Sequence, residues 1–97
     1  MGPDSYIGSI GQFAGSYDPL NWIACEGQTL NISEYGDLYN IIRNRWGATV
    51  ETFNLPDYRP VSPEGARIDW DQAGVPRICI CYAGLYPQAN TGNSKPL

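Results

Sequence analysis

The sequence predicts an α+β fold, mainly β, in which short antiparallel strands carry one packed helix. Eleven Gly and eight Pro divide the 97 residues into short segments and favour a loop-rich β domain. Aromatic residues reach 12% while charged residues are only 16%, a composition that does not suit a disordered polar chain. A single stretch, 35–46, has apolar residues at helical spacing. The length allows one domain, expected at 1–90, with a polar C-terminal tail at 91–97.

The N-terminal part is predicted to form three short strands. Residues 10–14 follow a glycine-rich start, and residues 22–25 are a compact apolar run that Glu26 and Gly27 stop. Gly27 suits a tight turn, because glycine adopts a positive φ without steric cost. Residues 28–30 are therefore expected to pair back onto 22–25 across that turn.

The predicted helix comes next. Asn31 is the expected N-cap, with Glu34 three residues later as in a capping box. Arg43 and Arg45 would lie in the last turns, where positive charge opposes the helix dipole, and Gly47 would follow the C-terminus. Five apolar side chains share one face of this helix: Tyr35, Leu38, Tyr39, Ile42 and Trp46.

The C-terminal half is predicted to be irregular around short strands. Residues 52–57 alternate apolar and polar, after which Pro60 and Pro63 prevent a continuing ladder. Residues 67–70 are expected to form another short strand. Residues 77–82 give the strongest strand signal, with β-branched or aromatic side chains at every second position.

The charge balance and the missing residue types exclude several classes of function. The net charge is −4, so counterion release at a phosphate backbone would give no affinity, and nucleic acid is not expected as a partner. No apolar run approaches the roughly 20 residues of a membrane span, and no signal peptide opens the chain, so no membrane insertion is expected. The chain has no His, the commonest general base and the commonest metal ligand.

Three cysteines form the first group with possible chemistry. Cys79 and Cys81 would share one face of a strand, and Cys25 is the third thiol. A structural zinc site wants four ligands, and a nucleophilic Cys wants a base such as His. We therefore expect reduced, buried cysteines and no metal or cofactor, while a bond from Cys25 to either other Cys stays open for an oxidising medium.

The second group is Asp69-Trp70-Asp71, two carboxylates beside an aromatic ring. On a strand the carboxylates would lie on one side about 6–7 Å apart, a geometry that excludes neither a glycosidase nor a shared divalent cation. An exposed polar turn beside a buried Trp is the favoured interpretation. No catalytic residue is assigned, and we expect no enzyme.

Four segments, taken in order, resemble the phage tail collar domain, a family of bacteriophage tail-fibre and baseplate proteins with microcystin-dependent-like bacterial relatives. They are IGSIGQFAG at 7–15, PLNWIACEGQTL at 19–30, the helix ending in Trp46-Gly47, and TFNLPDYR at 52–59, with a closing strand at 77–90. The resemblance marks a set of scaffold residues in which Asp57 is expected to cap backbone donors or pair with Arg59. The set is Trp22, Cys25, Gly27, Phe53, Leu55, Pro56, Asp57 and Arg59.

The resemblance implies a structural virion component of a bacteriophage tail, in a tail fibre, tail tip or baseplate. It implies a homo-oligomer, expected to be a trimer, that docks on other tail proteins and is assembled in the host cytoplasm. The long distal insertion of the family is missing after Arg59, and no His is present to hold a metal there. The expected oligomer interface is apolar and lies near the closing strand: Ile78, Ile80, Tyr82, Leu85 and Tyr86.

The alternative function is a receptor-recognition module that binds a host-surface carbohydrate. Aromatic platforms with carboxylate acceptors suit sugars, and the expected contacts are Tyr58, Asp69, Trp70 and Asp71. A small glycan hydrolase and a bacterial collar-like protein outside any virion are the remaining alternatives.

Overall fold

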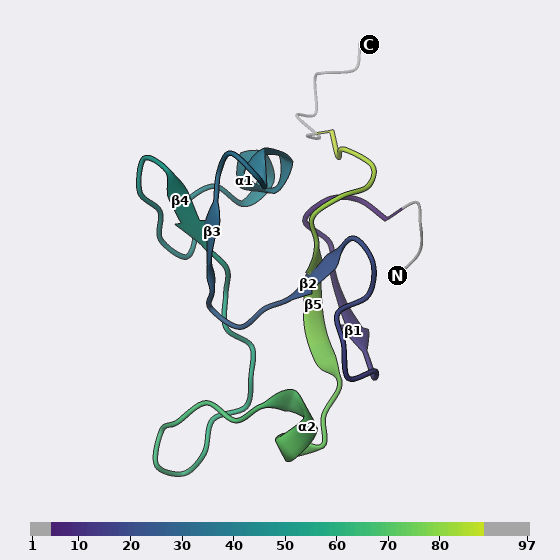
Figure 1. Cartoon of the computed structure of the whole chain (residues 1–97), viewed down its shortest axis with the longest axis vertical. Coiled ribbons are helices and arrows are strands. Elements are labelled where there is room, and N and C mark those ends of the chain that lie inside the picture. Colours follow the sequence, from purple (N-terminus) through teal and green to yellow (C-terminus); the bar gives the residue numbers. More distant parts are fainter. Residues whose placement is uncertain (1–4, 89–97) are drawn as a thin grey trace.

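The computed structural model describes residues 5–88, which form a β-dominated α+β fold with five short strands and two short helices (Figure 1). The polar tail expected at 91–97 lies outside the described residues. In chain order the elements are β1 (Ile10–Phe13), β2 (Trp22–Ala24), β3 (Thr29–Asn31), α1 (Gly36–Ile42), β4 (Thr52–Asn54), α2 (Trp70–Ala73) and β5 (Arg77–Cys81).

The main sheet has three antiparallel strands in the order β1-β5-β2. β5 is the centre, with Ile80 opposite Ile10 on β1 and opposite Ile23 on β2. Its apolar residues pack on both faces, as expected for a central strand. The strong strand prediction for the 77–82 segment is confirmed.

A second sheet pairs β3 with β4, with Leu30 opposite Phe53. The predicted pairing of 28–30 with 22–25 is therefore wrong. After β2 the chain bends away and runs beside the 54–57 segment, where Gly27 N–H donates to the carbonyl of Pro56 at 3.0 Å. That bond and a second one, from Leu55 N–H to the Gln28 carbonyl at 3.0 Å, use the backbone groups that a β2–β3 hairpin would need.

The helix α1 is shorter than predicted. It begins at Gly36 with Tyr35 at its N-cap, so Asn31 does not cap it, and the Asn31 amide donates to the Glu34 carboxylate at 3.1 Å. The helix ends at Ile42, and Arg43 at its C-cap turns to a positive φ of 54°. Arg43 and Arg45 therefore lie beyond the last helical turn and not within it.

The segment 67–70 is not a strand. Trp70 begins the one-turn helix α2, in which Ala73 N–H donates to the Asp69 carbonyl at 3.0 Å. Gly74 ends the turn in the left-handed conformation, with φ of 70°. Local hydrogen bonds over four residues thus make this segment a helical turn, and the fold has a second helix.

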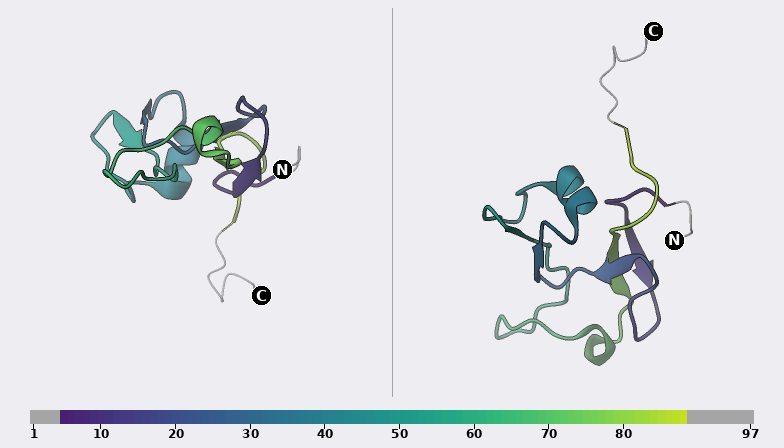
Figure 2. Two further views of the ribbon diagram at one scale, coloured as in Figure 1. Left: turned by 90° about the horizontal axis from the view of Figure 1, so that it is seen from below. Right: turned by 45° about the horizontal axis from the view of Figure 1, so that its top comes forward.

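The core consists of two clusters that share the main sheet. The larger joins the sheet to α1 and the β3–β4 pair, which lie together to one side of the sheet (Figures 1 and 2). Its buried members are Ile7, Cys25, Leu30, Leu38, Ile42, Phe53, Leu55 and Ile80. The smaller packs α2 against the sheet through Trp22, Ala24, Trp70, Cys79 and Cys81. No helix within residues 5–88 is long and apolar enough to cross a membrane.

Candidate functional site

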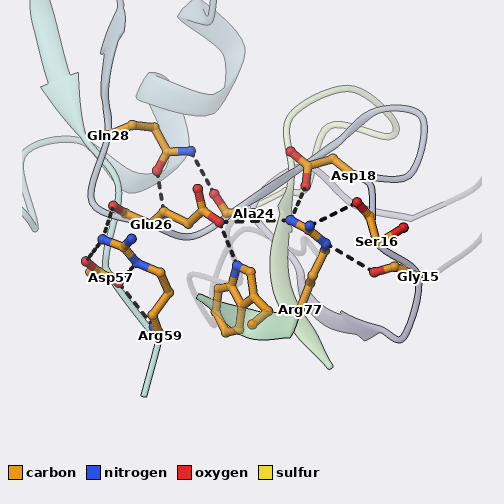
Figure 3. Close-up of polar contacts among 10 residues, drawn as sticks. Gly15, Ser16, Asp18, Ala24, Glu26, Gln28, Asp57, Arg59 and Arg77 are labelled. Carbon is orange, nitrogen blue, oxygen red and sulfur yellow. Dashed lines mark hydrogen bonds and ion pairs between the residues drawn. The ribbon is translucent and has the colours of Figure 1, made fainter. Parts of the chain in front are cut away.

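The scaffold residues of the sequence resemblance occupy the core and one polar contact at its edge. Trp22, Cys25, Phe53, Leu55 and Pro56 are buried. Burying such side chains contributes about 1.5–3 kcal/mol each, so these positions act mainly through packing. Asp57 and Arg59 lie beside Glu26, at the point where the chain leaves β2 and passes the end of β4 (Figure 3). Gly27 lies against Asp57 at the same point.

Asp57 binds Arg59 through both carboxylate oxygens. The Arg59 backbone N–H and Nε donate to Oδ1 at 3.1 and 3.0 Å, and Nη2 donates to Oδ2 at 2.8 Å. The same guanidinium reaches the Glu26 carbonyl at 3.4 Å, and Arg67 lies 3.6 Å from Asp57. The hydrogen bonds from Arg59 hold the pKa of Asp57 below its usual value. The prediction that Asp57 caps a backbone donor or pairs with Arg59 is confirmed in both forms.

Gly27 completes this contact. Its φ is +73°, the positive value expected of this glycine, although no β2–β3 hairpin forms there. A Cβ placed on it would lie 3.3 Å from Cβ and Oδ2 of Asp57. A side chain would be strained by the backbone and would press on the carboxylate that Arg59 holds.

Glu26 forms a second polar contact, which the sequence did not indicate. Its Oε2 accepts a hydrogen bond from Trp70 Nε1 at 2.6 Å, and its backbone N–H donates to Gln28 Oε1 at 2.9 Å (Figure 3). The Gln28 amide in turn donates to the Ala24 carbonyl at 2.8 Å. Glu26 therefore fixes both the start of β3 and the orientation of the Trp70 indole.

Arg77 extends this network to the β1–β2 loop. Its guanidinium donates to the carbonyls of Gly15 and Ser16 at 3.1 and 3.0 Å, and it lies 3.4 Å from Asp18 and 3.9 Å from Glu26. One cation from β5 thus holds a loop some sixty positions earlier in the chain (Figure 3). The contacts use carbonyls and carboxylates as structural acceptors.

The three cysteines are free and buried. Cys25 packs in the larger cluster, whereas Cys79 and Cys81 pack in the smaller one. Burial raises the pKa of Cys25 to about 12 and that of Cys79 to about 11, so these thiols are not nucleophiles at neutral pH. Within residues 5–88 no group of three His, Cys, Asp or Glu side chains could hold a metal ion.

The residues expected to contact a carbohydrate do not form one surface. Trp70 is only 1% exposed, so the favoured interpretation of a buried Trp is confirmed and its assignment as a surface platform is wrong. The ring fills the smaller cluster, and its one polar atom is bound to Glu26. Asp69 and Asp71 flank it as exposed residues at the start of α2, not on a strand. Tyr58 is 41% exposed.

Only part of the expected oligomer interface is exposed. Ile80 is 1% exposed and belongs to the larger cluster, because it lies on the central strand, so it is a core residue. Ile78 and Tyr82 are half-buried. Leu85 and Tyr86 are 46% and 50% exposed, and with Tyr6 they line a surface hollow of about 620 Å³.

A family model described as the phage tail collar domain matches residues 8–63. This chain belongs to the phage tail collar domain family. Neither curated proteins nor solved structures gave a match. The matched range contains all the scaffold residues and strands β1 to β4, whereas α2 and β5 follow it. Membership in this family implies a structural component of a phage tail.

Proposed function

We propose that this collar domain is a structural subunit of a tail fibre, tail tip or baseplate, and that it forms a trimer which docks on other tail proteins. The family match over residues 8–63 carries the proposal. The structure supports it, because the residues of the resemblance fill the core or hold one turn. The free, reduced thiols suit assembly in the host cytoplasm before incorporation into the virion tail.

Tyr6, Leu85 and Tyr86 supply the surface for self-association. Hydrogen bonds from Ile7 N–H to the Leu85 carbonyl at 2.8 Å, and from Leu85 N–H to the Ser5 carbonyl at 3.0 Å, hold the two segments side by side. Three large apolar side chains are thereby gathered at one place and left open. A patch of this kind on a small domain is typical of a protein interface.

Sedimentation equilibrium at micromolar concentration tests this proposal. We expect the wild-type chain to be a trimer, and the double variant Leu85→Asp/Tyr86→Asp to be a folded monomer. Val50→Asp is the matched control, because Val50 is exposed elsewhere, beside Glu51 and Ser33. A wild-type chain that stays monomeric would overturn the trimer.

The carbohydrate-binding alternative lacks the aromatic ring on which a sugar would stack, because Trp70 is buried inside the fold. Only Tyr58, Asp69 and Asp71 remain accessible of the four expected contacts. In our proposal any part in host attachment comes from the tail structure that the trimer completes, and not from a sugar site on this chain.

A further inference from the structure

The arginines of the described chain fall into two groups. Arg59 and Arg67 pair with Asp57, and Arg77 pairs with Asp18 and Glu26. Arg43 and Arg45 are exposed and form no ion pair with any residue between 5 and 88. Each of these two guanidinium groups instead lies over an aromatic ring, at 6.0 Å from the Tyr39 centroid and 5.2 Å from the Trp46 centroid.

The backbone of Arg43 does not explain why arginine stands there. Its φ of 54° and ψ of −134° form a conformation that glycine adopts freely and a larger residue adopts under strain. Strain of about 1–3 kcal/mol at a non-glycine residue is typical of positions whose side chain has a task beyond the fold. The guanidinium is the feature of Arg43 that glycine would lack.

Asp69 and Asp71 provide the complementary feature. Both are exposed, and neither forms an ion pair in the described part of the chain. The hydrogen bond to Asp57 is the main cause that raises the pKa of Arg59, and the charge of Asp69 adds to it. The Arg59 guanidinium itself is bound to Asp57 and not to Asp69. The two carboxylates are two positions apart, as the two arginines are, and they flank Trp70, which its bond to Glu26 keeps in place.

The two pairs belong to different ends of the molecule. Arg43 caps the C-terminus of α1, which lies toward the upper end of the long axis, whereas Asp69 and Asp71 belong to α2 at the lower end (Figure 1). They cannot meet within one copy. They can meet between copies.

We propose that Arg43 and Arg45 of one copy bind Asp69 and Asp71 of a second copy in a head-to-tail contact. The inference rests on the self-association proposed above and names a contact that orients it. A contact between two different surfaces of identical chains closes into a ring when the rotation between copies allows it. Exposed ion pairs are worth at most about 1 kcal/mol each, so the four charges select and orient the partner, while apolar burial supplies most of the affinity.

Charge reversal and its repair test this contact. The variants are Arg43→Asp/Arg45→Asp, Asp69→Arg/Asp71→Arg, and the chain that carries all four substitutions. Each double variant places like charges opposite one another, so we expect self-association to weaken roughly tenfold or more. The fourfold variant restores opposite charges, and its affinity is expected to return to near the wild-type value. Glu51→Arg/Glu64→Arg is the control for the aspartate variant, since it raises the net charge by the same amount at two other exposed carboxylates.

Sedimentation equilibrium gives the readout at low and high salt, with circular dichroism to establish that every variant is folded. Affinity of the wild-type chain should fall as salt rises, because exposed charges are screened. A wild-type oligomer that tolerates both double variants would overturn the contact and leave the trimer intact. Folded double variants that dissociate without repair in the fourfold variant would overturn it as well. A wild-type chain that stays monomeric at low salt would overturn both proposals.

Discussion

The indole Nε1 of Trp70 lies 2.6 Å from Oε2 of Glu26, although the two residues are 44 positions apart. Glu26 stands just after β2, inside the segment that matches the family, and Trp70 begins α2, which follows that segment. The bond therefore attaches the additional part of the chain to the collar scaffold. Trp70 fills the smaller core cluster, and Glu26 satisfies its polar atom.

Glu26→Ala should destabilise the fold by about 1–3 kcal/mol, because it leaves the N–H of a buried indole without an acceptor. Glu26→Gln keeps an acceptor oxygen and should cost less than about 1 kcal/mol. Urea unfolding at one fixed protein concentration measures both. The exposed Glu64→Ala serves as control and should stay within about 0.5 kcal/mol of wild type. Equal losses in Glu26→Ala and Glu64→Ala would show that the indole bond contributes nothing.

Asp57 should make stability depend on pH in the acid range. Arg59 lowers the pKa of the folded-state carboxyl, so the stabilisation is fully present above the unfolded-state value of about 4 and is lost as pH falls through the lower folded-state value. Asp57→Asn should therefore cost about 1 kcal/mol between pH 5 and 7, and this difference from wild type should shrink below about pH 4. Urea unfolding over this pH range measures it. A difference that stays constant down to pH 2 would contradict the ion pair.

Arg43→Gly should stabilise the domain by up to about 1 kcal/mol, because the gain from relieving a strained positive φ exceeds the cost of a more flexible unfolded chain. Arg45→Gly is the matched control in the same turn. Its φ is not positive, so the substitution should be destabilising by up to about 1 kcal/mol. Thermal unfolding compares them at a protein concentration low enough for every variant to be monomeric, so that loss of the proposed contact between copies does not affect the comparison. Destabilisation by Arg43→Gly would show that the position is not strained.

The three thiols should resist alkylation in the folded protein. All are buried, and burial raises the pKa of Cys25 and Cys79 to about 12 and about 11. Iodoacetamide at pH 8 should modify them at the rate of unfolding, and all three should react at once in concentrated urea. Mass spectrometry counts the modified sites over time. Rapid labelling of Cys25 without denaturant would contradict its place in the core.

Local interactions were predictable from the sequence, and distant ones were not. The pairing of Asp57 with Arg59 spans two residues, and turn chemistry suffices to anticipate it. β5 was predicted because its alternating β-branched residues are a strong pattern. The partner of β3 was not, since a three-residue strand carries too little pattern to fix its register and contacts with β4 decide it.

In the candidate site, too, local features were predictable and contacts between distant residues were not. The scaffold residues could be identified because their spacing matches the family, but the contact between Glu26 and Trp70 carries no local signal. Contacts with distant segments made Ile80 a core residue, and they bury Trp70 as the favoured interpretation expected, which removes it from the alternative carbohydrate contact. Burial of a single aromatic or aliphatic side chain depends on which segments fold over it, and short apolar runs do not encode that.

The central place of β5 has a consequence for how the protein is made. β1 and β2 leave the ribosome before β5, yet among residues 5–88 their only partner in the main sheet is a strand that ends at Cys81. At about 5–20 residues per second, the nascent chain spends several seconds with two open strand edges and no neighbour for either. The sheet therefore forms only when translation has passed β5, and a ribosome that stalls beyond β4 would hold a chain with exposed edges, ready to pair with a second nascent copy.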